Sequence, residues 1–199
     1  MLCSIAAMER TEDMETAVFY LEWLGLDKSL FRILAMLADV GQFRGNLSDL
    51  CRYFSLNPQT KTRETLRTAI EHLAATGFIT CERSGNTYTL SAVPKANEIE
   101  IHKEWLHRLK SHDYSSEPVA WEQVLKVHLW IMLHSSDPVV KNAAIAADLN
   151  ISVSTIGSAK NVLQKEYEAI TRNYVSKKIG ENRFMREGQK LVASAWWKE

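Results

Sequence analysis

The sequence predicts a mostly α-helical chain with small β-hairpins, an α+β fold in which two similar modules follow one another. Two stretches carry this prediction, TLRTAIEHLAATGFI over residues 65–79 and TIGSAKNVL over residues 155–163. Each stretch follows a short apolar helix and a turn, and each precedes an alternating segment with a Gly-Asn or Gly-Glu-Asn reversal. A helix, a turn, a second helix and a hairpin are therefore expected twice in 199 residues.

The two modules align in two pieces. Leu56-Asn57 matches Leu149-Asn150 at an offset of 93 residues, and residues 65–73 match residues 155–163 at an offset of 90. The difference between the offsets places extra residues in the turn of the first module. The repeat is too long for a solenoid unit, so we interpret it as a tandem duplication of a domain.

The first module is assigned to residues 26–93, after an N-terminal region (1–25) with one apolar helix over 14–24. Its first helix is capped by Asp27 and stopped by Gly41. A second helix begins near Asn46 or Ser48. Thr62 is expected to cap a third helix that runs to about Thr76, and Gly77 to end it. FITCER and TYTLS then form a hairpin around Ser84-Gly85-Asn86.

Residues 94–119 are expected to form a helical linker, with a helix over 95–112. The second module, residues 120–199, is predicted to begin with a buried helix over 121–134. Asp137-Pro138 starts the next helix, with Val140 on its inner side, and Ser152 caps the third. The predicted end of the chain is a hairpin over 170–186, reversing at 180–182, and a final helix over 188–197.

Composition places the chain among ordinary globular proteins of a reducing compartment. Cys3, Cys51 and Cys81 are widely spaced and form no metal or disulfide pattern, which suggests the cytoplasm. No apolar run approaches the roughly 18 residues that a membrane span requires, and the first residues lack the pattern of a signal peptide. A cytoplasmic protein without a membrane partner is expected.

No catalytic motif is present, so no enzyme activity and no cofactor are expected. His102, His107 and His112 are spaced five apart, which turns them away from one another on a helix and rules out a shared metal. A ligand pocket lined by tryptophans of the linker and second module is the alternative to simple packing, and packing is favoured. The sequence indicates no small-molecule ligand.

Double-stranded DNA is the expected partner, read by the third helix of each module. Cationic side chains and short hydroxyl groups on an exposed helix suit base edges and phosphates. In the first module these candidates are Lys61, Thr62, Arg63, Thr65, Arg67 and Thr68, and in the second they are Ser152, Ser154, Thr155, Ser158 and Asn161. The same residue types also occur on solvated helix faces that bind nothing.

The second hairpin adds Lys177, Lys178 and Arg183 as candidates for phosphate contacts. Residues 170–190 carry six basic and two acidic side chains, although the net charge of the chain is zero. The alternative interpretation is that these lysines only protect a sheet edge from aggregation.

The stretch TLRTAIEHLAATGFI resembles the recognition helix of the winged helix-turn-helix superfamily, including bacterial regulators of the GntR and MarR types. The match runs through Thr65, Leu66, Ala69, Leu73, Gly77 and Ile79, with Ile70 in place of Leu. The second module matches through Ser152, Ser154, Thr155, Ile156, Ala159 and Leu163, and it departs at Lys160 and lacks the Gly after the helix. LDKSLFRILAML also resembles the first helix of replication-organiser proteins from phages and plasmids.

The resemblance implies tandem winged helices and a DNA-binding protein, most simply a bacterial transcriptional regulator. Two alternatives stay open: a replication initiator of a plasmid or mobile element, and a protein-docking scaffold that binds no DNA, which the zero net charge favours. A homodimer is expected through the helix over 14–24 and Trp196-Trp197, because exposed apolar surface usually marks an interface.

Overall fold

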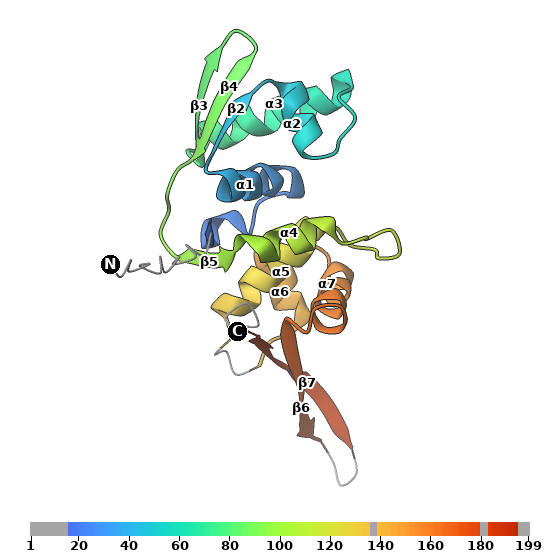
Figure 1. The fold of residues 1–199 in the computed structure, drawn as a ribbon. Coiled ribbons are helices and arrows are strands. Elements are labelled where there is room, and N and C mark those ends of the chain that lie inside the picture. Colours follow the sequence, from blue (N-terminus) through green and yellow to red (C-terminus); the bar gives the residue numbers. More distant parts are fainter. Residues whose placement is uncertain (1–15, 136–138, 180–182, 195–199) are drawn as a thin grey trace, which may run out of the picture.

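The chain folds as an α+β protein in which helices carry three small antiparallel sheets (Figure 1). The structure, a computed structural model, describes residues 16–135, 139–179 and 183–194. The first module comprises α1 (Lys28–Val40), β2 (Gln42–Gly45), α2 (Leu47–Tyr53), α3 (Thr60–Ala75), β3 (Ile79–Ser84) and β4 (Thr87–Ala92). Its three strands form one sheet in the order β2-β4-β3.

The second part of the chain repeats this order of elements. It comprises α5 (Trp121–Leu133), α6 (Asn142–Leu149), α7 (Val153–Lys165), β6 (Ile170–Lys178) and β7 (Phe184–Ala193). Between α5 and α6, where the first module has β2, Val140 forms an isolated antiparallel bridge to Gln189 of β7. The β3–β4 and β6–β7 hairpins project from opposite ends of the molecule (Figure 1).

A middle layer lies between the two modules. Its first strand occupies residues for which the sequence predicted an N-terminal helix. Residues 16–20 form a strand, β1 (Thr16–Tyr20), followed by the short 3-10 helix η1 (Leu21–Trp23). β1 pairs along its whole length with β5 (Glu98–His102), and α4 (Lys103–Ser111) follows β5 directly. The helix prediction over 14–24 was wrong because the apolar positions serve a sheet whose second strand lies some eighty residues later in the sequence.

The predicted linker helix over 95–112 was also wrong in its first part, because residues 98–102 form a strand that pairs with the distant β1. EIEIH alternates in burial, with Ile99 and Ile101 buried and their glutamate neighbours exposed, which is the pattern of a half-buried strand. Only residues 103–111 are helical. Phe19, Trp23 and Leu24 are buried in the chain's own core, which removes the N-terminal basis for the expected homodimer.

Other predicted boundaries shift by a few residues. The third helix of the first module begins at Thr60 with Gln59 as N-cap, so Thr62 lies inside the helix and does not cap it. Its predicted end at Gly77 is confirmed: the Phe78 and Gly77 amides donate to the Leu73 and Ala74 carbonyls, and Gly77 has a φ of 70°. α7 reaches a comparable end without glycine, because Glu168 adopts a φ of 51°.

The end of the chain differs most from the prediction. The segment 188–193, expected to be helical, continues strand β7. Val140, expected inside a helix, belongs to the bridge, and α6 begins two residues later. The predicted helix start at residues 137–138, the reversal at 180–182 and Trp196-Trp197 lie outside the described residues.

Buried polar residues of α5 tie the two modules together. Lys126 is 1% exposed, and its ammonium donates to the carbonyl oxygens of Leu26, at 2.7 Å, and Leu149, at 2.9 Å. Burial lowers the pKa of Lys126 to about 8. The fully buried carboxylate of Glu122 forms an ion pair with Arg32 of α1, and Lys28 lies 3.9 Å from its other oxygen. One contiguous apolar core runs through both modules.

His128 of α5 predicts a specific pH dependence of folding stability. Burial lowers its pKa to about 4, and Trp105 donates to its Nδ1 at 3.1 Å. The unfolded state binds a proton near pH 6.5 and the folded state only near pH 4, so stability falls as the pH drops through this window. We expect a loss of about 2 kcal/mol between pH 7 and 5, from the same linkage relation.

Urea unfolding at both pH values measures this loss. His128→Gln keeps an acceptor for Trp105 but does not ionise, so its stability should change less between the two pH values. His72→Gln, at an exposed position of α3, is the matched control and should keep the wild-type difference. Equal pH dependence in the wild type and His128→Gln would refute the assignment.

Candidate nucleic-acid interface

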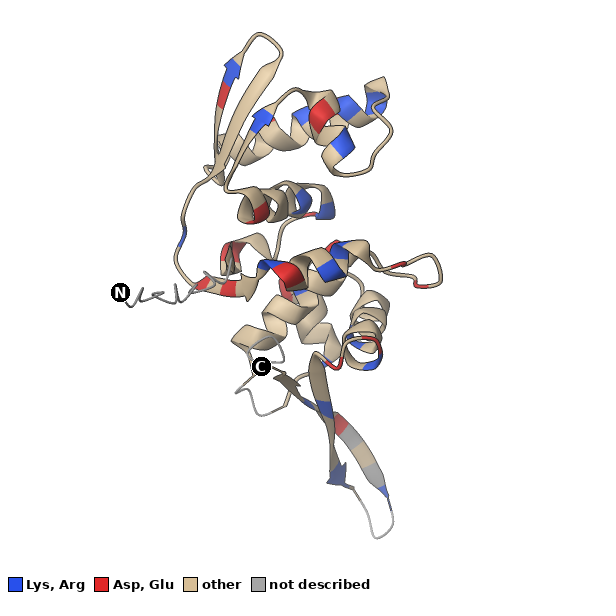
Figure 2. Ribbon diagram, viewed as in Figure 1, with Lys and Arg blue, Asp and Glu red and all other residues tan. Residues whose placement is uncertain are grey.

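A cationic hollow of the first module lies between α2, the N-terminal half of α3 and the β3–β4 hairpin. It encloses about 590 Å³, and arginines from all three elements line it. These are Arg52 from α2, Arg63 and Arg67 from α3, and Arg83 from β3. We call this hollow the arginine groove. Basic residues gather on this end of the molecule, whereas acidic residues cluster around η1 and β5 (Figure 2).

Local structure positions the floor of the arginine groove. Asn46 caps α2: its side chain accepts from the amides of Ser48 and Asp49, and Asp49 accepts from the Asn46 amide at 2.8 Å. This capping box fixes the start of α2 against β2. On the opposite wall Tyr88 of β4 lies beneath Arg83, whose guanidinium is 5.3 Å from the ring centre.

The arginines of the groove are partly held and partly available. Arg67 pairs with Glu64 at 2.9 Å through Nη1, while its buried Nε has no hydrogen-bond partner among the described residues. Arg52 pairs with Asp49 at 3.1 Å, and Arg83 donates to the Gly85 carbonyl. Arg63 is exposed. Guanidinium groups in a shallow hollow suit the two adjacent acceptors of guanine or a phosphate.

The predicted residues of α3 divide between two faces of the helix. Arg63 and Arg67 line the arginine groove, whereas Lys61, Thr65 and Thr68 line a second hollow of about 500 Å³ against the start of α1. Thr65 is engaged within its own helix, because its hydroxyl donates to the Lys61 carbonyl at 3.0 Å. Thr62 is half-buried and lines neither hollow.

In the second module the predicted hydroxyl groups serve the start of α7. Ser152 caps the helix, as predicted, by accepting from the Thr155 amide at 3.1 Å. Its hydroxyl also lies 2.8 Å from that of Ser154 and 2.7 Å from that of Thr155. Ser158 is half-buried, and the exposed Asn161 accepts from Arg172 of β6 at 2.9 Å. This helix therefore brings no cation to its exposed N-terminal half.

The second hairpin brings Lys177, Lys178 and Arg183 to its outer end. Lys177 faces Met185 and Lys178 faces Phe184 across the ladder, and the Ile179 amide donates to the Arg183 carbonyl at 2.9 Å. Consecutive strand residues point to opposite faces, so the two lysines present charge on both sides of the hairpin. All three cations are exposed.

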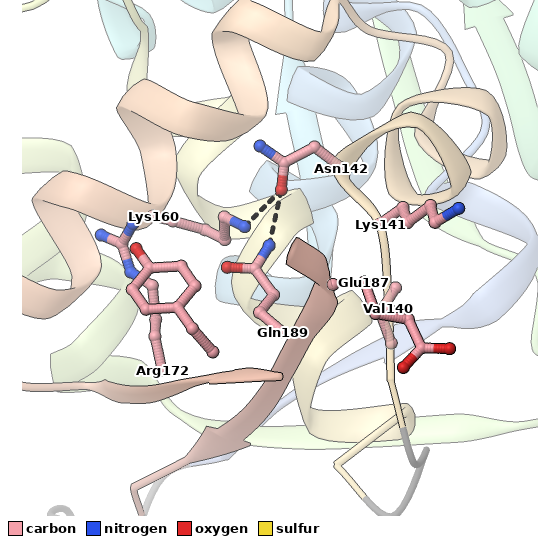
Figure 3. A pocket seen from close by; sticks show the side chains of 9 residues that line it. Val140, Lys141, Asn142, Lys160, Arg172, Glu187 and Gln189 are labelled. Atoms are coloured by element: carbon pink, nitrogen blue, oxygen red, sulfur yellow. Dashed lines mark hydrogen bonds between the residues drawn. The ribbon is translucent and has the colours of Figure 1, made fainter. Parts of the chain in front are cut away.

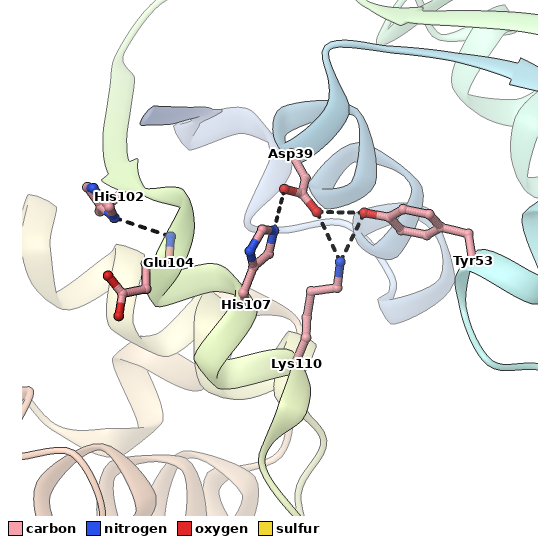
Figure 4. A network of polar contacts seen from close by, with 6 residues as sticks. All are labelled: Asp39, Tyr53, His102, Glu104, His107 and Lys110. Atoms are coloured by element: carbon pink, nitrogen blue, oxygen red, sulfur yellow. Dashed lines mark hydrogen bonds and ion pairs between the residues drawn. The ribbon is translucent and has the colours of Figure 1, made fainter. Parts of the chain in front are cut away.

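A polar network fixes α4 against the first module (Figure 4). The Asp39 carboxylate of α1 accepts from the Tyr53 hydroxyl at 2.6 Å and from Lys110 at 3.1 Å, and it lies 2.8 Å from His107. Burial acts to raise the pKa of Asp39, but these hydrogen bonds outweigh it and hold the pKa below its ordinary value. Below the arginine groove the network joins α1, α2 and α4, and its role is structural.

Sequence reasoning missed several residues of these sites. Arg52, Asn46 and Tyr88 enter the arginine groove from elements that the recognition-helix pattern does not include. Among the described residues, no three histidine, cysteine or acidic side chains are grouped to hold a metal ion. None of the helices in the described part of the chain has the length and apolar composition of a membrane span.

Comparison with known proteins adds no relative. A scan against protein-family models found no match, and a search of curated proteins found none either.

Proposed function

We propose that the chain is a double-stranded DNA-binding protein built from two winged helix-turn-helix modules. The arginine groove is the observation that carries this proposal. It brings four arginines together where the third helix and the hairpin of the first module meet. The repeated order of helix, strand or bridge, two helices and hairpin supports the tandem arrangement.

The two modules differ in the chemistry that they offer to DNA. The first presents Arg63 and Arg67 on its third helix, so we assign base reading to it. The second presents small side chains on α7 and cations on β6–β7, which suit the phosphate backbone. The hairpin then positions the protein, and the first module selects the sequence.

The protein-docking alternative is favoured by one feature, exposed apolar residues on the second hairpin. Tyr174, Ile179 and Met185 are each more than half exposed. A steep salt dependence of duplex binding separates the two functions, because it reports the number of phosphates neutralised.

Binding of the full chain to pools of random fluorescent duplex at two salt concentrations tests the proposal. We expect saturable binding that weakens strongly as salt rises. A chain that binds no duplex even at low salt would refute DNA binding. Selected sequences then separate the two DNA roles: a promoter operator supports a transcriptional regulator, and repeated sites beside an origin support a replication initiator.

Replacing Lys177 and Lys178 by Ala should weaken binding to all duplexes to a similar degree. The salt slope should flatten by about one to two units, since each phosphate contact contributes about 0.9. The urea midpoint should stay unchanged, because both lysines are exposed at the end of β6 and neither contributes to the core. Lys165→Ala, at the end of α7, is the single-site control for loss of charge alone. Wild-type affinity and salt slope in the double variant would leave these lysines with a role only at the sheet edge.

A further inference from the structure

A buried lysine occupies a core position of the second module. In the aligned stretches Lys160 of α7 stands where α3 has Ile70, and both residues are 1% exposed. Ile70 packs in an apolar core, whereas the Lys160 ammonium donates to the side-chain oxygen of Asn142. The two modules therefore differ in polarity at one equivalent point.

The difference extends to the neighbours of Lys160 (Figure 3). Asn142 is the first residue of α6, and the first residue of α2 is the buried Leu47. The Asn142 side-chain oxygen also accepts from Gln189 of β7 at 2.6 Å. Three side chains from three elements thus form a polar group at the foot of the second hairpin, which we call the Lys160 site.

Burying an ammonium costs free energy that its hydrogen bonds rarely recover, and an apolar residue of similar volume is commonly as stable or more so. The first module has isoleucine, Ile70, at the position equivalent to Lys160. The second module therefore keeps a buried polar group where the first module has an apolar residue, and buried ionisable groups beside a hollow are candidates for binding.

A hollow of about 350 Å³ opens beside the Lys160 site. Lys141 and Arg172 add two more cationic side chains to its lining, and Tyr174 adds an aromatic ring. Among the described residues of the lining Glu187 is the one acidic residue, and its carboxylate points away from Lys160 and Asn142 in Figure 3. The hollow offers ammonium, guanidinium and amide donors, which is the chemistry that binds a phosphate group.

We propose that the second module binds a small phosphorylated ligand at the Lys160 site. The ligand's phosphate takes hydrogen bonds from Lys160 and Gln189, and Arg172 and Lys141 balance its charge. A free ligand is favoured over a phosphate of the DNA backbone because Lys160 is buried at the base of the hollow, whereas the exposed cations lie at the outer end of the hairpin. Binding of this ligand would be a second function of the protein, and the proposal does not depend on DNA binding.

Titration calorimetry of the full chain tests the proposal, first with inorganic phosphate and then with a panel of mononucleotides and sugar phosphates. We expect saturable binding of phosphate, and tighter binding of at least one organic phosphate that also contacts Tyr174. Lys160→Met keeps an unbranched side chain, one atom shorter and without the charge, and should reduce the affinity at least tenfold. Lys165→Met, five residues later and exposed on the same helix, should bind as the wild type does.

Lys160→Ile introduces the residue of the first module and guards against a misfolded variant. This variant should fold with at least the wild-type urea midpoint and bind no phosphate. Three results would each overturn the proposal: no phosphate binding by the wild type, undiminished binding by Lys160→Met, or a loss confined to duplex DNA. The last result would assign the site to a phosphate of the DNA backbone. Failure of duplex binding alone leaves phosphate binding unaffected, so the two functions fail separately.

Discussion

Glu122→Gln should lower the free energy of unfolding by about 2–4 kcal/mol, close to the cost of breaking a buried ion pair. The carboxylate is fully buried in α5 and pairs with Arg32 of α1. The neutral amide leaves a guanidinium that is only 20% exposed facing an uncharged partner. Urea unfolding at pH 7 measures the loss.

A double-mutant cycle separates this pair from general packing. Arg32→Met alone should also destabilise, and the double variant should lose less than the sum of the two single losses. Glu71→Gln, at an exposed position of α3, should change stability by less than about 0.5 kcal/mol. Strict additivity of the Glu122 and Arg32 losses would show that the pair does not couple the modules.

Arg67→Ala should weaken binding to the preferred duplex by about 1–3 kcal/mol, the contribution of a good bidentate contact to a base. The loss should be much smaller for random duplex, because a base contact discriminates among sequences. Arg63→Ala should act in the same direction, and the double variant should lose most of its sequence preference. Fluorescence anisotropy with both duplexes measures each loss.

Arg44→Ala is the matched control for the arginine groove. Arg44 faces Thr89 in the sheet, whereas Arg83 faces Tyr88, so alternate residues place Arg44 on the other face from the groove. Its loss should affect both duplexes alike and only weakly. Unchanged preference among sequences in Arg67→Ala would remove α3 from base reading.

The local signals of the sequence predicted the helices of the first module well, and the middle layer and the end of the chain badly. The apolar stripe of α3, its end at Gly77 and the Ser152 cap depend on neighbours within a few residues, and all three are confirmed. The β1 strand depends on a partner in the linker, and no local pattern indicates that pairing. From its own residues alone, METAVFYLEWL is therefore predicted to be a helix, and only the pairing with β5 identifies the strand.

The candidate sites show the same division. Arg63 and Arg67 follow from the helix pattern, but Arg52 and Arg83 join them only through tertiary structure. Lys160 was visible in the sequence as a departure from the module pattern. Its meaning required the positions of Asn142 and Gln189, which come from two other elements.

The β1–β5 pair affects how the two modules unfold and where the folded chain can be cleaved. It joins the segment before the first module to the segment after it, so β5 and α4 of the connection between the modules belong to a folded layer. With the shared core, we expect this layer to make the two modules one cooperative unit. A protease should spare residues 98–111 in the folded chain, and neither half expressed alone should fold. The two modules are therefore expected to unfold together rather than one at a time.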